Sequence, residues 1–339
     1  MIWSTAKNNG IVIGADDITL DLNGYRVDGD GTSFGGCVQG EVCDTGLLNS
    51  GHDGIVVKGG TVREFSLGVL VYKARHNRVL NISTTNNRFV GIGMVRCAQS
   101  AVRGSSGRKN IGQDGDGMFL LESHHVRVLN NVFVNNGDLG IHVGESSNNL
   151  LRGNLIARNR TASIIEGNRN SVRRNLIRNN EENVIFAGNK NVIVRNRVSG
   201  GIPGARTSGI AVELGRGNLI ARNVVADVHG PGITLGLAHP SFGGTNNVVR
   251  HNLVRGSHGD GVSVAIKDDH SLLKRNIVVG ARGDGLDVEG RATRVTGNLA
   301  TRNGDLGIEA AGWVIDGGGN IARHNTDPRQ CTGIRCKHH

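Results

Sequence analysis

The sequence is poor in the residue types on which helical and nucleic-acid-binding proteins rely. Of its 339 residues only four are proline and three are methionine, and aromatic residues make up 3%, whereas 53 residues are glycine. Proteins that bind single-stranded nucleic acid need aromatic platforms for the bases, so a nucleic-acid partner is disfavoured. So many glycines also disfavour a run of amphipathic helices. The apolar runs are far too short for a helix that crosses a bilayer, which argues against a membrane span.

Cysteine is also scarce, and its spacing predicts local disulfides. Cys37 and Cys43 lie close together in one stretch, and Cys331 and Cys336 lie close together near the C-terminus. Neither pair has the CxxC spacing of a metal site, and two such pairs favour an oxidising compartment. We expect Cys97 to face the core of a repeat, where it has no partner in its own loop, so it is predicted to stay reduced.

An extracellular or periplasmic location follows from this cysteine pattern. No secretory signal is recognisable in the sequence. The expectation therefore requires that a targeting segment has been removed and that Met1 is a cloning start. We interpret His338 and His339 as the remnant of a tag and leave them out of the functional argument.

The sequence does contain a repeat of about 22 residues, marked by an asparagine with an aliphatic residue or alanine two places later. The repeated asparagines are Asn131, Asn154, Asn175, Asn196, Asn223, Asn252, Asn276, Asn298 and Asn320. Nine places after many of them comes a glycine followed by an aliphatic residue, as in Gly140-Ile141 and Gly261-Val262. Each repeat therefore holds at least two short strands.

A unit of this size cannot bury its apolar side alone, so successive units must stack. Equivalent residues would then lie about 4.8 Å apart along the axis. An inward asparagine is costly unless its amide is satisfied, and a column of stacked amides supplies the partners. The repeat predicts an all-β fold, a single-stranded parallel β-helix of about a dozen coils with its asparagines in one row.

The segment from Gly10 to Gly24 resembles the opening coils of right-handed parallel β-helix repeat proteins of the pectate-lyase-like superfamily. The Asn-x-aliphatic repeats are similar to those of its carbohydrate-binding and sugar-hydrolase branch, and the resemblance covers nearly the whole chain. It implies right-handed coiling. It leaves function open, because this fold hosts lyases, hydrolases, epimerases and non-catalytic proteins.

No linker interrupts the repeats, which run from about residue 11 to about residue 325. We therefore predict a single domain over residues 1–339, closed by a short disulfide-linked tail at residues 326–337. Insertions in a solenoid become loops on its flank. The stretches that break the rhythm are expected to wall a binding groove, and they are residues 28–53, 103–115, 200–208 and 238–245.

The formal net charge is +10, and basic residues gather just before the repeated asparagines. They are Arg152, Arg173, Arg174, Arg195, Arg222, Arg250, Lys274, Arg275 and Arg294. Two interpretations stay open. Arginine stems cover apolar surface on the water face of a stacked strand, whereas a basic row also suits an acidic polysaccharide as partner.

A candidate site appears when four successive repeats are aligned on Val69, Ile92, Met118 and Ile141. A charged residue then follows four places after each, and adjacent members of this column would lie about 5 Å apart. The catalytic candidates are Lys73, Arg96, Glu122, His142 and Glu145, and the substrate-binding candidates are Tyr72, His124, His125 and Arg152. We expect the loop 103–115 to overhang this patch.

The patch suits proton abstraction next to a carboxylate. Such a reaction needs a cation that stabilises the enolate and a base poised near neutral pH. Arg96 fits the first role, and Lys73, Tyr72 or His142 the second. The resemblance implies that a lyase of this superfamily typically uses Lys or Arg as base, often with calcium. The structural alternative is a ladder of opposite charges, worth about 0.2 to 1 kcal/mol per pair.

A second group of carboxylates centres on Asp260 and Asp284, which occupy the same place in successive repeats. Stacked carboxylates repel one another. They persist if water screens them, if a cation lies between them, or if each caps a turn through backbone amides. Turn capping is the ordinary explanation, and a calcium site at Asp260 and Asp284 is the alternative.

The leading hypothesis is a monomeric enzyme that acts on an acidic, uronate-containing polysaccharide as a lyase or epimerase. One alternative is a non-catalytic carbohydrate-binding or structural solenoid. Another is a periplasmic accessory protein that resembles copper-site maturation factors of similar repeat pattern. A third is a glycoside hydrolase with paired carboxylates. Calcium is the one cofactor that these hypotheses include.

Overall fold

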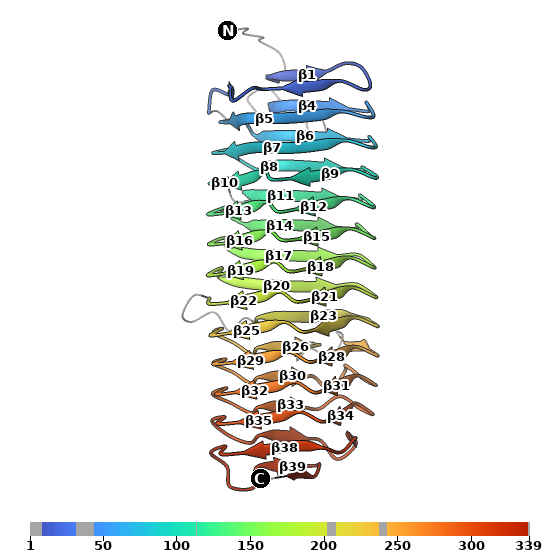
Figure 1. The fold of residues 1–339 in the computed structure, drawn as a ribbon, viewed down its shortest axis with the longest axis vertical. Helices are drawn as coiled ribbons and strands as arrows, with labels where there is room; N and C mark the ends of the chain where they lie inside the picture. The colour runs from blue at the N-terminus through green and yellow to red at the C-terminus, as the bar shows by residue number, and fades with distance from the viewer. Residues whose placement is uncertain (1–8, 32–43, 113, 202–207, 237–242, 338–339) are drawn as a thin grey trace. The chain divides into compact units, whose positions relative to one another are not determined.

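Two β-helical units make up the chain. The structure, a computed structural model, describes residues 9–31, 44–112, 114–201, 208–236 and 243–337. Unit 1 is residues 1–164 and unit 2 is residues 165–339. In each unit the strands pair in parallel, and no helix occurs among the described residues. Each unit is a right-handed parallel β-helix, as the resemblance implies, and together they comprise about 12 coils, as the repeat predicts (Figure 1).

In unit 1 every coil contributes one strand to a first sheet and one or two strands to a second. The first-sheet strands are β1 (Ile11–Ile13), β4 (Thr45–Ser50), β6 (Leu67–Tyr72), β8 (Val90–Val95), β11 (Asp116–Leu121) and β14 (Leu139–Gly144). The second-sheet strands are β2 (Thr19–Asp21), β3 (Arg26–Asp28), β5 (Val56–Arg63), β7 (Arg78–Thr85), β9 (Ala101–Arg103), β10 (Ser106–Arg108), β12 (Arg127–Leu129), β13 (Val132–Val134), β15 (Leu150–Arg152) and β16 (Leu155–Ala157). Strand β17 (Thr161–Glu166) contains the residues at which the two units divide.

Unit 2 repeats this plan. Its first-sheet strands are β20 (Glu182–Ala187), β23 (Ile210–Arg216), β26 (Ile233–Leu235), β30 (Val262–Val264), β33 (Leu286–Val288), β36 (Ile308–Ala310) and β39 (Cys331–Thr332), with β27 (Gly244–Thr245) paired to β23. Its second-sheet strands are β18 (Ser171–Arg173), β19 (Leu176–Arg178), β21 (Val192–Val194), β22 (Arg197–Ser199), β24 (Leu219–Ala221), β25 (Val224–Ala226), β28 (Val248–Arg250), β29 (Leu253–Arg255), β31 (Leu272–Lys274), β32 (Ile277–Val279), β34 (Arg294–Thr296), β35 (Leu299–Thr301), β37 (Ile315–Asp316), β38 (Asn320–Arg323) and β40 (Cys336–Lys337).

The predicted asparagine row is confirmed within unit 2. The backbone N–H of Asn223 donates to Oδ1 of Asn252 (2.9 Å), and that of Asn252 donates to Oδ1 of Asn276 (3.1 Å). The side-chain amides are linked too, with Nδ2 of Asn252 3.0 Å from Oδ1 of Asn276. The same pattern continues through Asn298 to Asn320. Each buried amide is thus satisfied by its neighbours, which is the condition that an inward polar side chain must meet.

Sequence reasoning found one of these ladders, and the structure contains others. In unit 1 the backbone N–H of Asn87 donates to Asn110, and that of Asn110 donates to Asn136. In unit 2 Asn191, Asn218 and Asn247 form a ladder at another turn of the coil. Because each coil bends several times, more than one of its bends needs a buried side-chain acceptor for the backbone.

The glycine that precedes the inward aliphatic residue has a steric cause. At Gly117 an added Cβ would lie 2.6 Å from the carbonyl oxygen of Gly140 and 2.8 Å from Nδ2 of Asn136. Gly117 thus starts its strand directly against the next coil and the asparagine ladder. A side chain there would force the coils apart.

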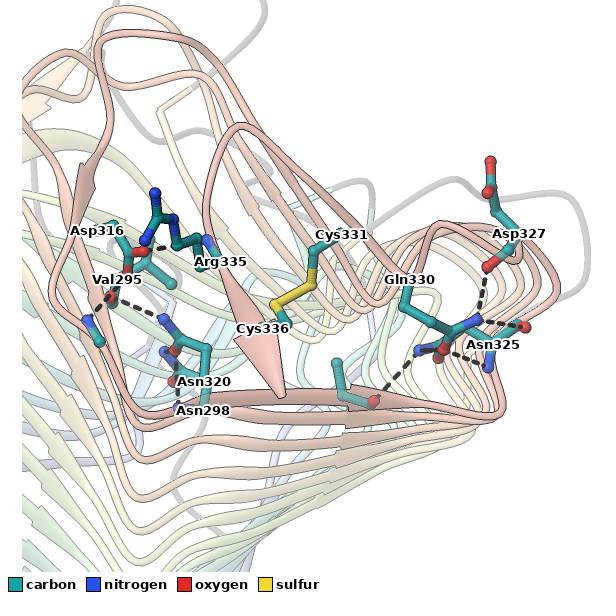
Figure 2. Close-up of a disulfide and its surroundings, with 12 residues drawn as sticks. Val295, Asn298, Asp316, Asn320, Asn325, Asp327, Gln330, Cys331, Arg335 and Cys336 are labelled. Carbon is teal, nitrogen blue, oxygen red and sulfur yellow. Dashed lines mark hydrogen bonds between the residues drawn. A yellow bond between two sulfur atoms is a disulfide. The ribbon is translucent and has the colours of Figure 1, made fainter. Parts of the chain in front are cut away.

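The C-terminal end of unit 2 is closed by a side-chain cap and a disulfide. Gln330 takes the place of a further ladder asparagine, since its Oε1 accepts from both the backbone N–H and Nδ2 of Asn325 (3.0 and 2.9 Å) (Figure 2). Cys331 and Cys336 form the predicted disulfide beside it. Cys97 is a free, buried thiol, also as predicted. Cys37 and Cys43 lie outside the described residues.

The prediction for the loop 103–115 is wrong in two respects. Ser106–Arg108 is strand β10, paired with β7 and β13, so much of the stretch belongs to the coil. The described part of the remainder lies at the start of β11, where the backbone N–H of Gly112 donates to Arg88 and that of Gly137 donates to Asn110. It therefore lies about 20 Å from the far end of β11, which is the end that carries Glu122 of the candidate column, and it does not overhang the patch.

No helical segment in the described ranges meets the length and hydropathy of a bilayer crossing.

Candidate functional site

The column of charged residues predicted from the repeat exists in unit 1. Val69 pairs with Ile92, Ile92 with Met118, and Met118 with Ile141, which is the predicted alignment. The column itself follows the ends of β6, β8, β11 and β14. The backbone N–H of Lys73 donates to Val95 (2.9 Å), that of Arg96 to Leu121 (2.9 Å) and that of Glu122 to Gly144 (3.1 Å). Lys73, Arg96, Glu122 and Glu145 thus occupy the same place in four consecutive coils.

A sharp turn determines how this column is presented. All four residues adopt the left-handed conformation, with φ of 51° at Lys73, 54° at Arg96 and 47° at both glutamates. The next residue of each coil then points inward, as at Cys97, whose backbone N–H donates to the buried hydroxyl of Ser123 (3.0 Å). A left-handed residue other than glycine or asparagine is strained. The four charged side chains are therefore held at an exposed corner that a glycine would form at lower cost.

Arg96 and Glu122 form a two-point ion pair along the column. Nε of Arg96 lies 2.8 Å from Oε2 of Glu122, and Nη2 lies 3.1 Å from Oε1. The hydrogen bond between them lowers the pKa of Glu122 and raises that of Arg96. Both side chains are about half exposed, at 48% and 46%. This geometry fixes the guanidinium, and it leaves some of its five N–H donors unused.

Tyr72 lies beside the two cations of the column. Nζ of Lys73 is 5.0 Å from the centre of the Tyr72 ring. Hydrogen bonding to Lys73, together with the positive charges of Lys73 and Arg96, lowers the pKa of the Tyr72 phenol. Two adjacent cations favour the phenolate because they stabilise its negative charge. The Tyr72 phenol thus loses its proton more readily than an ordinary tyrosine does.

The turn adds further polar side chains next to the column. His124 pairs with Ala98 and Ser147 in neighbouring coils, and its Nδ1 accepts from the backbone N–H of Ser147 (3.2 Å). His125 follows in a left-handed, exposed position. Arg75 and His76 occupy the equivalent places in the coil of Lys73. Sequence reasoning missed Arg75 and His76. Their signal was available, because they stand two and three places after Lys73 as His124 and His125 stand after Glu122.

His142 is not part of the same cluster. It projects from the face of β14, in register with Phe119 and, through it, Gly93 and Leu70. Tyr72 belongs to a different row, three coils away, which corresponds to about 14 Å along the axis. Nδ1 of His142 instead lies 3.9 Å from Oδ2 of the nearly buried Asp116. Burial raises the pKa of Asp116 to about 8, and the negative charges of Asp138 and Asp114 add to the shift.

Arg152 and Glu145 do not complete the site in the way the sequence suggests. Arg152 ends β15, beyond the turn that carries the column, and pairs in register with Leu129. Its side chain is exposed at the opposite end of that strand. Glu145 lies next to Glu122 at the end of the column, three coils away from Lys73. The cluster that the structure brings together is therefore Tyr72, Lys73, Arg96 and Glu122, with Arg75 and His76 beside it.

The carboxylates of unit 2 cap turns, as the ordinary explanation predicted. Oδ1 of Asp260 accepts from the backbone N–H of Asp284 (2.9 Å), and Oδ1 of Asp284 accepts from that of Leu306 (2.8 Å). Each aspartate thus caps the next coil. No group of three or more His, Cys, Asp or Glu side chains able to hold a metal ion occurs in the described residues. Calcium at Asp260 and Asp284 stays a prediction.

These carboxyl groups are nevertheless perturbed. Burial raises the pKa of Asp284 to about 7, with added repulsion from Asp260 and Glu309. Burial and the charge of Asp260 also raise the pKa of Asp287 to about 7, and Asp287 pairs with Ser263 on one side and Glu309 on the other. The shifts follow from packing carboxylates into a stack where water is partly excluded.

Known proteins share this architecture. The chain is similar to the A-module of mannuronan C-5 epimerase AlgE4 from Azotobacter vinelandii, with 14% identity over 96% of this chain and 89% of that chain and a TM-score of 0.54. It is also similar to a variant of the periplasmic alginate epimerase AlgG, with 14% identity, coverage of 84% and 73%, and a TM-score of 0.52. A variant tailspike of E. coli bacteriophage HK620 in complex with a pentasaccharide gives 12% identity, coverage of 84% and 56%, and a TM-score of 0.51.

At these identities the likeness shows the fold alone. No curated protein sequence matches the chain. The profile of the family described as periplasmic copper-binding protein (NosD) matches residues 5–198 and 182–321. The chain therefore belongs to the NosD family, and the periplasmic location of that family agrees with the extracytoplasmic location predicted from the cysteines.

Proposed function

We propose that this protein modifies an acidic, uronate-containing polysaccharide, by elimination or epimerisation, at the cluster of Tyr72, Lys73, Arg96 and Glu122. The observation that carries the proposal is the placement of the Tyr72 phenol beside two cations from adjacent coils, which lowers its pKa. A base of lowered pKa next to fixed positive charge is what abstraction of a proton next to a carboxylate requires.

Each member of the cluster has a distinct role in this proposal. The phenolate of Tyr72 removes the proton from the carbon that bears the substrate carboxylate. Lys73 and the free N–H donors of Arg96 bind that carboxylate and stabilise the negative charge that develops on it. Glu122 is a positioning residue, because its two hydrogen bonds hold the guanidinium of Arg96 in one orientation. Elimination then expels the glycosidic oxygen, whereas epimerisation returns a proton to the opposite face of the ring.

The names of two structurally similar proteins support the proposed substrate class, a uronate polysaccharide. Two of the structures that share the fold are named as epimerases of alginate or mannuronan, which are uronate polymers. The low identity means that this support concerns the fold and the kind of ligand that it accommodates. The residues of the site are argued from this chain alone.

Copper, which the family description names, does not fit the side chains that the structure describes. The soft ligands that select Cu(I) are thiolates and thioethers. Here the Cys97 thiol is 1% exposed, hydrogen bonded to the carbonyl of Val71, and raised in pKa to about 11 by burial. Met94 and Met118 are fully buried in the core. His229 and His258 approach with ring centres 4.5 Å apart, but two imidazoles do not make a closed site.

A non-catalytic, carbohydrate-binding role in the periplasm is the second candidate. The ion pair between Arg96 and Glu122 is equally what this role would show, because a charge ladder without chemistry needs only the same two-point contact. Under this alternative Tyr72 has no chemical role. The two candidates predict different effects of Tyr72→Phe, which removes only the phenol oxygen: a large loss of turnover if Tyr72 is the base, and no effect if it has no chemical role.

The test is to incubate the protein with alginate, polygalacturonate and glucuronan and to follow two signals. Absorbance of the unsaturated product reports elimination, and deuterium uptake from heavy water into the polymer reports epimerisation. On a substrate that the parent protein converts, Tyr72→Phe is expected to lower turnover about a hundredfold or more, the usual effect of losing a general base. Arg96→Ala is expected to lower it by a similar factor.

Tyr25→Phe provides the matched control. The sequence has two tyrosines, and Tyr25 is 75% exposed and lies outside the cluster. Its variant should keep full turnover. Unchanged turnover in Tyr72→Phe would remove the phenol from the mechanism, and no conversion of any of the three polymers by the parent protein would favour the binding role.

A further inference from the structure

We propose that unit 2 carries a separate docking ridge for a linear acidic polysaccharide. The ridge is a column of four arginines and one histidine at one turn of five consecutive coils, here called the cationic column. It consists of Arg174, Arg195, Arg222, His251 and Arg275. This proposal concerns binding and does not rest on the chemistry proposed for Tyr72.

The five side chains stand directly above one another. The backbone N–H of Arg195 donates to Ala221 (3.1 Å), that of Arg222 to Arg250 (3.1 Å) and that of His251 to Lys274 (3.0 Å). Each acceptor is the residue just before the next member of the column, so adjacent members are about 4.8 Å apart along the axis. All five are exposed. The spacing is close to the length of one sugar residue.

The column occupies a conformationally costly position. All five residues adopt φ between 53° and 58°, in the left-handed region. The residue that directly precedes the buried asparagine in other coils is one that adopts this conformation cheaply, namely Asn130, Gly153, Gly297 and Gly319. Arginine at this turn sacrifices stability relative to asparagine or glycine. The use of cations in five successive coils therefore needs a reason other than the turn.

The charges of the column are not neutralised by the protein. Within the described ranges no carboxylate lies within ion-pair distance of any of the five side chains. The pKa of the exposed His251 is lowered, first by partial loss of contact with water and then by the positive charges of Arg250, Arg275, Arg222 and Lys274. Mutual repulsion of this kind is relieved when an anion binds.

Coverage of apolar surface does not explain the column. If the arginine stems served that purpose, the aliphatic side chains beside them would be buried. Leu176, two residues after Arg174, is instead 37% exposed, and Ile277, two residues after Arg275, is 42% exposed. Exposed aliphatic groups next to cations suit the C–H faces of sugar rings that carry an anionic substituent.

A nucleic acid fits this surface less well. Single-strand binders stack the bases on aromatic side chains. Phe186 is the one Phe, Tyr or Trp among the described residues between 165 and 300, and it is fully buried. The column therefore offers charge and aliphatic contact without a stacking platform, and an acidic polysaccharide is the partner that it favours.

The experiment compares two triple variants with equal loss of charge. The column variant is Arg195→Asn, Arg222→Asn and Arg275→Asn, which installs the residue that the same turn uses at Asn130 and should not lower the melting temperature. The control variant is Arg178→Gln, Arg255→Gln and Arg323→Gln, three exposed arginines at strand ends away from the column. Binding of alginate oligosaccharides and of oligothymidylate of equal charge is measured by calorimetry at two salt concentrations.

The column variant is expected to bind alginate oligosaccharides about tenfold or more weakly, with a flatter salt dependence, because three contacts of modest energy are lost together. The control variant should change less than about threefold by the same reasoning. Equal losses in both variants, or none in the column variant, would overturn the proposal. Tighter binding of oligothymidylate than of alginate, lost in the column variant, would assign the ridge to nucleic acid instead. The three arginines changed in the column variant lie in unit 2, outside the cluster of Tyr72, Lys73, Arg96 and Glu122, so failure of the ridge and failure of the proposed enzymatic function are measured independently.

Discussion

Removal of one ladder asparagine tests the physical basis of this fold. Asn252 is 1% exposed, and its side chain and backbone N–H make five hydrogen bonds in unit 2. Its Oδ1 accepts from the backbone N–H and Nδ2 of Asn223 (2.9 and 3.1 Å), and its Nδ2 donates to Ile220 (2.9 Å) and to Asn276 (3.0 Å). Its own backbone N–H donates to Asn276 (3.1 Å) and survives replacement by alanine.

The cost of Asn252→Ala follows from the groups left without partners. The backbone N–H of Asn223 would become unsatisfied inside the protein. The Asn223 amide would lose one of its acceptors, and the carbonyl of Ile220 would lose its bond to the Asn252 amide but keep its place in the strand ladder. A buried polar group that loses its partner costs about 1 to 3 kcal/mol. With about 0.5 to 1.5 kcal/mol for each of the two other lost hydrogen bonds, the total loss of stability is expected to be about 2 to 6 kcal/mol. It is concentrated in the coils next to Asn252, since a solenoid couples mainly nearest neighbours.

Two measurements check this estimate. Urea unfolding followed by circular dichroism gives the loss of stability, and hydrogen exchange gives the protection of the Asn223 amide. Asn168→Ala is the control, because the exposed Asn168 accepts from the backbone N–H and Nδ2 of Asn189, and water can replace it. A loss below about 1 kcal/mol for Asn252→Ala, with the Asn223 amide still protected, would refute the reasoning, because buried ladder groups would then carry no penalty.

The remaining predictions concern charge and sulfur. Protonated Asp116 stabilises the fold below about pH 4, and this contribution is lost as the pH rises toward about 8, its pKa in the folded protein. Asp116→Asn should therefore lessen the fall in melting temperature between pH 5 and pH 8, and an unchanged fall would contradict the assignment. Lys73→Met should raise the pKa of the Tyr72 phenol and move the pH profile of turnover to higher pH, whereas an unmoved profile would exclude Tyr72 as the titrating base. Reduction of the bond between Cys331 and Cys336 should cost about 2 kcal/mol, the entropy of a short loop, and mainly loosen the last coil as seen by hydrogen exchange; uniform loosening of unit 2 would be the contrary result. Cys97 should resist thiol reagents until the protein unfolds, because it is buried and its pKa is raised to about 11, and rapid labelling of the native protein would argue against that burial.

The repeat in the sequence determined the fold and the alignment of the coils. A stack of parallel strands hydrogen bonds residue to residue, so a fixed period in the sequence becomes a row in space. This is why the row from Asn223 to Asn320 and the column from Lys73 to Glu145 could both be predicted. The disulfide between Cys331 and Cys336 was predictable for a related reason, since the two cysteines are five positions apart in the sequence and only a local loop has to close.

The tertiary structure decided which side chains of a row meet. His142 and Tyr72 both flank the predicted column, but they project from different rows three coils apart, and this depends on the path of each strand and its turn. Arg152 and the segment 103–115 were misplaced because the sequence does not show where a coil bends, and short strands such as β10 look like loop sequence. The left-handed turns that hold Tyr72 beside Lys73 and Arg96, and that line up the cationic column, arise from the closure of each coil on its neighbours. A period of residues sets spacing along the axis, whereas the direction of a side chain around the axis is fixed only when the whole coil packs.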